Sequence, residues 1–187
     1  AIHNLELLVT MDLFINDIAK NSDIVFGVKS SYEKYGVYVN AERRLHLSVP
    51  YIQNNLPDDW EVLQAIENKI TNKFHYNSTE EIFTDLTKEV KRYEGATYER
   101  LTKKPLQWPI YKDGTDSPIL HTEKFSTKNG KGHFHYRPYK IREQIQTLLE
   151  NREKFYLTTG RNIAHYNNSS QTKESEKLSK RYSDDIL

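Results

Sequence analysis

The sequence predicts an α/β fold that opens with part of a parallel sheet and its helices. Apolar runs at residues 7–9 and 24–26 have the length of buried strands, and the apolar positions within residues 13–19 have roughly helical spacing. A strand, a helix and a second strand in this order form the unit from which parallel sheets are built. Amphipathic helices are predicted next, which keeps the first half of the chain α/β.

Composition excludes several classes of function. The chain has 187 residues, enough for a single ordinary domain. Its 27 Lys and Arg nearly balance its 26 Asp and Glu, so the net charge of +1 gives no field that favours nucleic acid. Cysteine is absent, which excludes disulfides, a cysteine nucleophile, thiolate-bound zinc and iron–sulfur ligation within this chain.

Neither a membrane span nor a targeting segment is predicted. Only 36% of the residues are apolar and the mean hydropathy is strongly negative, so no stretch resembles a transmembrane helix. No basic and then apolar segment follows Ala1, so no signal peptide is visible and a cytoplasmic location is expected. Because the first residue is not Met, we expect a piece of a longer protein.

Residues 37–47 predict an extended segment interrupted by a polar turn. Apolar residues alternate partly on either side of Glu42, Arg43 and Arg44. The two guanidinium groups could bind phosphates through charge-assisted hydrogen bonds. A charged turn exposed to solvent is the simpler interpretation of the same residues.

Two amphipathic helices are predicted after this turn. Residues 57–61 form a strong start signal, because Asp58 can accept from first-turn amides and Glu61 completes a capping box. Residues 77–81 form a second start signal. The apolar positions are Trp60, Leu63, Ile66 and Ile70 on one face of the first helix, and Ile82, Phe83, Leu86 and Val90 in the predicted buried stripe of the second.

Glycines and prolines from Gly95 onward predict a long, turn-rich connection with short strand-like pieces such as residues 132–136. Connections of this kind are usually functional or lie over another domain. Residues 141–153 predict a short helix, and residues 154–159 predict a strand. The polar residues from Lys173 onward are expected to fray.

Two small clusters are candidate binding sites. Asp58 is sufficient for the helix cap, which leaves Asp59 free to accept from the amino or imino group of a ligand; a cap with no further role is the alternative. His133 and His135 fall on one face of a predicted strand. A metal site needs a third ligand and none has recognisable spacing, so a structural or surface role is the better interpretation.

The richest candidate follows the predicted strand at 154–159. Its polar groups are Thr158, Thr159, Gly160, Arg161, His165, Ser169, Ser170 and Thr172. Backbone amides at a strand end beside a guanidinium and hydroxyls suit an anion such as pyrophosphate, and a polar loop with a helix behind it is the alternative. The chain has no P-loop, no Gly-x-Gly-x-x-Gly motif and no Ser/His/Asp order, so it shows little sign of catalysis of its own.

One long stretch carries a family resemblance. Residues 95–101 (Gly-Ala-Thr-Tyr-Glu-Arg-Leu) and 106–109 (Leu-Gln-Trp-Pro) are followed by Gly-Thr at 114–115, Leu-His at 120–121 and Asn-Gly-Lys-Gly-His-Phe at 129–134. This run resembles the Gly-x-Thr-Tyr-Glu-Arg, Gln-Trp-Pro signature and the Gly-Thr, Leu-His, Gly-Lys-Ala-x-Phe run of formate dehydrogenase catalytic alpha subunits, which are molybdopterin oxidoreductases.

The resemblance extends over residues 5–172. The other blocks that resemble the family are residues 7–19, 23–26, 33–44, 57–60 and 157–172. It implies a partial Rossmann-like parallel sheet with helices in residues 1–75, and a helix with a turn-rich connection in residues 76–152. Residues 153–187 would then be the truncated start, with the first strand, of the molybdopterin-dinucleotide-binding β-barrel domain.

The resemblance also implies an activity and its cofactors. The parent protein would oxidise formate to carbon dioxide at molybdenum or tungsten held by bis(molybdopterin guanine dinucleotide), and electrons would leave through 4Fe-4S clusters. The implied partners are the remainder of the catalytic subunit and electron-transfer subunits. The family's cysteine-rich motif, its Cys or selenocysteine metal ligand and its catalytic Arg would precede Ala1, so this chain alone is expected to be inactive.

Residue by residue, the resemblance implies cofactor binding and no catalytic or metal-ligating residue in this chain. Asp59 matches the acidic residue that reads a guanine edge. Met11 stands where the family usually has Gln, and Gln171 stands where it usually has Met. The implied cofactor-binding positions are Met11, Asp12, Asp59, Thr159, Gly160, Arg161, His165 and Thr172.

Two alternatives stay open. The chain could be a split or remnant subunit that serves as a non-catalytic binding or assembly module. It could also come from another molybdopterin oxidoreductase, such as a nitrate reductase or a formylmethanofuran dehydrogenase, although residues 95–109 argue against this reading.

Overall fold

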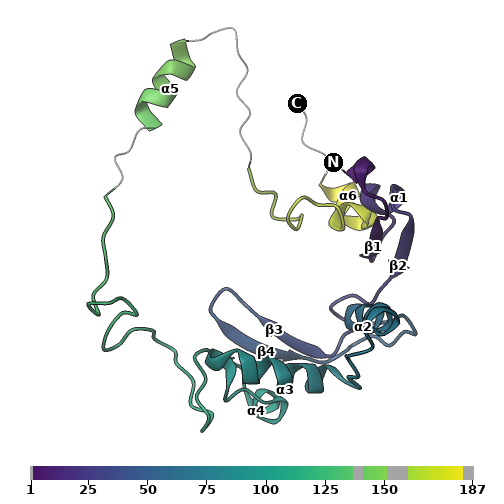
Figure 1. Cartoon of the computed structure of the whole chain (residues 1–187). Helices are drawn as coiled ribbons and strands as arrows, with labels where there is room; N and C mark the ends of the chain where they lie inside the picture. Colours follow the sequence, from purple (N-terminus) through teal and green to yellow (C-terminus); the bar gives the residue numbers. More distant parts are fainter. Residues whose placement is uncertain (1, 137–140, 151–159, 183–187) are drawn as a thin grey trace.

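The computed structural model describes residues 2–136, 141–150 and 160–182 (Figure 1). These residues form a mixed α/β structure with one small parallel sheet and one small antiparallel sheet. Within the described ranges, no helix combines the length and the apolar character needed to cross a membrane. The strand predicted at residues 154–159, and with it the first strand of the expected barrel, lies outside the described residues.

The parallel sheet consists of β1 (Val9–Asp12) and β2 (Ile24–Gly27), joined through the short helix α1 (Asp17–Lys20). The predicted order of strand, helix and strand is therefore confirmed, but the first strand begins at Val9 and not at Leu7, and neither strand is buried as predicted, because Val9 and Ile24 are exposed. Among the described residues the sheet has no further strand. The helix starts later than predicted because the Asp12 carboxylate accepts from the amide of Leu13 at 2.7 Å and from Asn16 Nδ2 at 2.6 Å. These bonds hold the intervening residues in a turn.

The antiparallel sheet has the order β3 (Gly36–Val39), β4 (Arg44–Ser48) and β5 (Leu106–Gln107). The extended segment with a polar turn predicted for residues 37–47 is confirmed, and the structure pairs its two halves, β3 and β4, as an antiparallel hairpin. Asn40 Oδ1 closes its turn by accepting from the amides of Glu42 at 2.9 Å and Arg44 at 3.0 Å. β5 joins the sheet from more than 50 residues further along the chain, which sequence patterns alone do not indicate.

Both predicted long helices form, the first with the predicted cap and the second at the predicted start signal. Asp58 precedes α2 (Asp59–Ile70), and its amide donates to the Glu61 carboxylate at 2.7 Å in a capping box. Ser78 precedes α3 (Thr79–Glu89) and accepts from the amide of Glu81 at 3.2 Å.

The remaining helical elements are short. They are the single turns η1 (Ile2–Asn4), η2 (Lys91–Tyr93) and η3 (Thr172–Glu174), and the helices α4 (Tyr98–Lys103), α5 (Ile141–Glu150) and α6 (Glu176–Arg181). α5 confirms the short helix predicted in this region. The prediction that the chain frays from Lys173 onward is wrong for the described residues, because the Leu178 carbonyl, among others, is bonded within α6.

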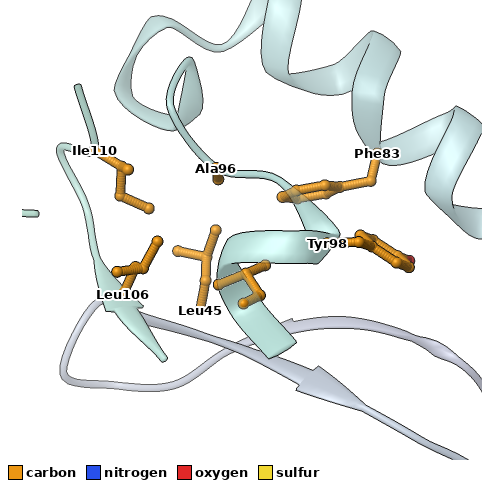
Figure 2. Close-up of a cluster of buried hydrophobic side chains, with 7 residues drawn as sticks. Leu45, Phe83, Ala96, Tyr98, Leu106 and Ile110 are labelled. Atoms are coloured by element: carbon orange, nitrogen blue, oxygen red, sulfur yellow. The ribbon is translucent and has the colours of Figure 1, made fainter. Parts of the chain in front are cut away.

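One hydrophobic core joins the hairpin to the helices beside it. It comprises Leu45, Phe83, Ala96, Tyr98, Leu101, Leu106 and Ile110 (Figure 2). Leu45 is completely buried. Gly95 allows the chain to close around this core, because a Cβ at that position would lie 1.6 Å from the carbonyl oxygen of Tyr111.

Two predicted apolar elements are not buried. In α2, Val62 is buried, whereas Leu63, Ile66 and Ile70 are 54%, 40% and 77% exposed. Residues 132–136 form no strand, and Phe134 is fully exposed. Helical spacing correctly places the α2 side chains on one face, but among the described residues that face is covered only in part, by Phe74, Tyr76 and Ile82 beside Trp60 and Leu63.

Leu45 provides a test of the core. We expect Leu45→Ala to lower the free energy of unfolding by about 2–5 kcal/mol, because it removes a fully buried side chain and leaves a cavity. Leu63→Ala is the matched control, and it should cost less than about 1 kcal/mol because Leu63 is 54% exposed. Urea unfolding followed by tryptophan fluorescence measures both. Equal losses would contradict this position of the core.

A second test concerns acid stability. Lys88 Nζ donates to Asp85 Oδ1 at 2.6 Å and Tyr76 Oη donates to Asp85 Oδ2 at 3.0 Å. These bonds lower the pKa of Asp85 below its ordinary 3.8. The stabilisation is therefore present above the pKa of the unfolded chain and is lost as the pH falls through the pKa of the folded one.

The unfolding midpoint in urea, measured from about pH 7 to about pH 3, should accordingly fall less for Asp85→Asn than for the wild type. Glu94→Gln is the charge-matched control at an exposed position. Parallel pH profiles for the wild type and Asp85→Asn would show that the cluster does not contribute.

Candidate functional site

A cavity of about 430 Å³ lies beside the start of α2. Its walls come from the segment leading into β3, from β3 itself, from the first turn of α2, from α3 and from α4. Figure 1 shows β3 and β4 beside α3 and α4. The volume falls within the range of about 300–1,000 Å³ typical of small-molecule sites.

Asp59 lines this cavity, as does Lys34. Asp59 is the first residue of α2 and takes no part in the capping box, as predicted. Its carboxylate is nevertheless paired, because the Lys34 ammonium donates to Oδ2. The Lys34 side chain is 22% exposed and that of Asp59 is 43% exposed. The pair is therefore partly buried and reaches solvent.

The neighbouring Asp58 has a different partner. Lys29 Nζ lies 3.7 Å from Asp58 Oδ1. The amide of Lys29 also donates to the carbonyl of Pro57 at 3.2 Å. Two lysines from the segment after β2 thus meet the two aspartates at the start of α2.

Buried polar atoms with incomplete hydrogen bonding lie around the cavity. Among the described residues, four buried side-chain atoms make no hydrogen bond of normal geometry, and three of them belong to residues that line the cavity. Of these, Asp58 Oδ1 is ion-paired with Lys29 and Tyr98 Oη interacts with the Thr79 side chain, which leaves Trp60 Nε1 without a partner in the described part of the chain. Burial raises the pKa of the Tyr98 hydroxyl, so the phenol remains a donor. Buried polar groups normally have partners, so the Trp60 indole N–H is a donor that a polar ligand in the cavity could use.

Aromatic rings form part of the wall. The rings of Tyr35 and Tyr98 meet edge to face with centroids 5.3 Å apart, and those of Phe83 and Tyr98 are 5.7 Å apart. Figure 2 shows Tyr98 beside Phe83 at the edge of the hydrophobic core. A flat aromatic ligand finds surfaces for stacking in such a wall.

Met11 and Asp12 lie at the end of β1, where ligands commonly bind to open parallel sheets. Met11 is opposite Phe26 in β2. The Asp12 carbonyl accepts from the amide of Val28 at 3.4 Å, directly before Lys29. The structure therefore links the end of β1 to the start of α2 through residues 28–29.

The segment around residues 160–172 is a compact loop. Thr159 lies outside the described residues, and both Gly160 and Arg161 are exposed. His165 Nδ1 lies 3.0 Å from Thr172 Oγ1, which also accepts from the amide of Tyr166 at 3.3 Å. The structure thus brings together two of the predicted site residues, His165 and Thr172.

The charged hairpin turn binds the chain itself. The Arg43 guanidinium donates to the carbonyls of Trp108, Ser117 and Pro118, and it lies over the Trp108 ring at 5.3 Å. Arg44 Nε pairs with Glu42 at 3.3 Å. The possible phosphate site at this turn is therefore not supported: the Arg43 guanidinium binds the connection that follows β5, and that of Arg44 is paired within the turn.

At the predicted histidine pair, His133 Nε2 lies 3.2 Å from Asn129 Oδ1. Across the described ranges, no group of three His, Cys, Asp or Glu side chains is placed to hold a metal ion.

Sequence reasoning missed Lys34 and Tyr98 as cavity residues. Lys34 lies 25 residues from Asp59, so only the folded chain brings them together.

Comparison with known proteins identifies relatives along almost the whole chain, although no protein-family model matches it. The chain is 33% identical over 183 residues to the alpha subunit of an F420-dependent formate dehydrogenase from Methanocaldococcus jannaschii, which covers 95% of this chain and 27% of the relative. It is 31% identical over 193 residues to the alpha subunit of F420-dependent formate dehydrogenase 2 from Methanococcus maripaludis, with 100% and 28% covered.

A putative formate dehydrogenase from Staphylococcus aureus is 31% identical over 179 residues, which are 92% of this chain and 17% of the relative. The chain thus spans between about a sixth and just over a quarter of the length of these relatives. Over nearly its full length, the chain is homologous to a segment of formate dehydrogenase alpha subunits.

Proposed function

We propose that the chain is a cofactor-binding part of a formate dehydrogenase that uses bis(molybdopterin guanine dinucleotide) with molybdenum or tungsten. The observation that carries this proposal is the 33% identity over 183 residues to a formate dehydrogenase alpha subunit. When bound, the metal centre supplies the two-electron oxidation of formate to carbon dioxide and a proton. The residues of this chain bind and orient the nucleotide ends of the cofactor.

Asp59 accepts from the guanine edge in this proposal. Its carboxylate lines a cavity of suitable size with aromatic walls, and among the described residues the buried Trp60 indole N–H beside it has no partner. The ammonium of Lys34 does not saturate the carboxylate, because two carboxylate oxygens offer about four acceptor positions. The amino and imino groups of guanine can therefore bind beside the ion pair.

The loop around residues 160–172 binds the pyrophosphate. Gly160 has no heavy atom within 4 Å of the position of a Cβ, so the backbone is open to a ligand, and the Arg161 guanidinium neutralises charge. The Thr172 hydroxyl accepts from the amide of Tyr166, and it can donate its own proton to His165 Nδ1. The imidazole proton then lies on Nε2, where it is available to a phosphate or to the pterin.

At the end of β1, Asp12 acts through the turn that it orders. Its carboxylate fixes the amide of Leu13 and the side chain of Asn16, and its carbonyl accepts from Val28. Met11 offers no hydrogen bond where a Gln side chain could provide one. In this proposal the end of β1 therefore shapes the guanosine site, and it makes few direct hydrogen bonds to the guanosine.

The partner in this proposal is the remainder of the alpha subunit, followed by electron-transfer subunits. A two-stranded parallel sheet is not stable alone, and large apolar residues around it are exposed, including Leu7, Ile15 and Ile18. The apolar face of α2 is exposed as well. The rest of an alpha subunit would add strands to this sheet and cover these side chains.

The alternative to this proposal is a split or remnant subunit that binds and assembles without catalysing. Complementation distinguishes the two. The chain by itself should show no formate-dependent dye reduction. Coexpressed with the rest of the Methanococcus maripaludis alpha subunit, from which the homologous segment has been deleted, it should restore dye reduction and retain guanine nucleotide in the purified complex.

Turnover by the 187-residue chain alone would contradict the proposal. A complex that assembles with bound nucleotide but never reduces dye would favour the non-catalytic alternative. The deleted alpha subunit without this chain is the negative control.

Arg161 provides a separate test of the pyrophosphate loop. Arg161→Gln should weaken binding of inorganic pyrophosphate to the full chain by about tenfold, because it removes a charge-assisted hydrogen bond, and it should reduce the dependence on salt. Arg181→Gln, at an exposed position in α6, is the control. Isothermal titration at two salt concentrations measures both. If both variants weaken pyrophosphate binding equally, the loss comes from the change in net charge, and Arg161 has no specific role in binding.

A further inference from the structure

We propose that Lys34 reads the O6 atom of the guanine whose imino and amino groups bind Asp59, and so selects guanine over other purines. This inference rests on the proposed function, because it concerns the same cavity. Lys34 and Asp59 come from different parts of the chain, yet both line the cavity and form an ion pair in its wall. The two groups therefore present one continuous polar edge.

The pattern of that edge matches guanine. Guanine offers an acceptor at O6, then a donor at N1 and a donor at the 2-amino group. The complementary edge is an ammonium, which donates to O6, beside a carboxylate, which accepts from N1 and from the 2-amino group. Adenine places an amino donor at position 6, so its amino group would face the Lys34 ammonium without an acceptor.

The ion pair leaves capacity for this ligand. The Lys34 ammonium has three donors, and its bond to Asp59 Oδ2 uses one of them. The Lys34 side chain is only 22% exposed, so the ammonium is held in place and partly shielded from water. A donor that is fixed in advance loses little freedom when the base binds, which strengthens its preference for an acceptor.

The cavity supplies two further features of a purine site. Tyr98, which is 4% exposed, lines it with a hydroxyl that interacts with the side chain of Thr79, another lining residue. Tyr35 packs edge to face on Tyr98 at 5.3 Å and offers an aromatic surface. The ion pair thus lies within a built pocket, not on an open helix end.

Lys29 is the matched control. It lies close to Lys34 in the chain and has an aspartate partner of its own, Asp58, at 3.7 Å. Lys29 is not among the residues that line the cavity. Replacing it removes the same charge without removing the proposed donor.

The test compares GMP with 6-thio-GMP, in which sulfur replaces O6 while the imino and 2-amino groups remain. Sulfur is a weak acceptor, so the full chain should bind GMP about tenfold more tightly than 6-thio-GMP. Lys34→Met should make the two affinities equal, whereas Lys34→Arg and Lys29→Met should keep the preference. Asp59→Asn should weaken both ligands and keep their ratio. Isothermal titration gives the affinities, and unfolding midpoints confirm that each variant folds.

Two results would overturn the inference. The first contradicts only the role of Lys34, and the second also contradicts the proposed guanine site. If GMP binds and Asp59→Asn weakens it, but Lys34→Met keeps the preference for GMP, Lys34 does not read O6 and the proposed guanine site stands. If the wild-type chain binds no GMP, the guanine site itself is wrong and the role of Lys34 falls with it.

Discussion

Burial of Leu45 is the constraint on which the described structure most depends. Its side chain lies between the β3–β4 hairpin and the segment that contains α3, α4 and β5. The same elements form most of the cavity walls, so the core fixes the site. Arg100 helps to close the chain around the core, because its guanidinium donates to the carbonyls of Gly95 at 2.6 Å and Lys112 at 3.0 Å.

Paired charges then connect this core region to the parallel sheet. Lys29 and Lys34 follow β2, and they meet Asp58 and Asp59 at the start of α2. Exposed ion pairs contribute little to stability, but these are partly buried and define geometry. The Lys34–Asp59 pair places an ammonium and a carboxylate side by side at the cavity, so the start of α2 presents a specific pattern of donors and acceptors.

Local features were predicted well because their causes are local. The capping box at Asp58 and the helix start at Ser78 follow from residues within a few positions of one another, and the strand–helix–strand unit around α1 pairs strands only 15 residues apart. The burial of α2 was not predictable from spacing. Its apolar face is exposed among the described residues, and periodicity reports which side chains share a face without reporting what covers them.

The sequence by itself determined the long helices, the first parallel pair and the relation to formate dehydrogenase alpha subunits, since each depends on the order of residues. Only the tertiary structure decided the rest. It turned Arg43 toward carbonyls some 65 to 75 residues away, added β5 to the hairpin and brought Lys34 to Asp59. These contacts are separated by 25 residues or more, and they form because the core closes the chain on itself, a condition that no local pattern of residues records.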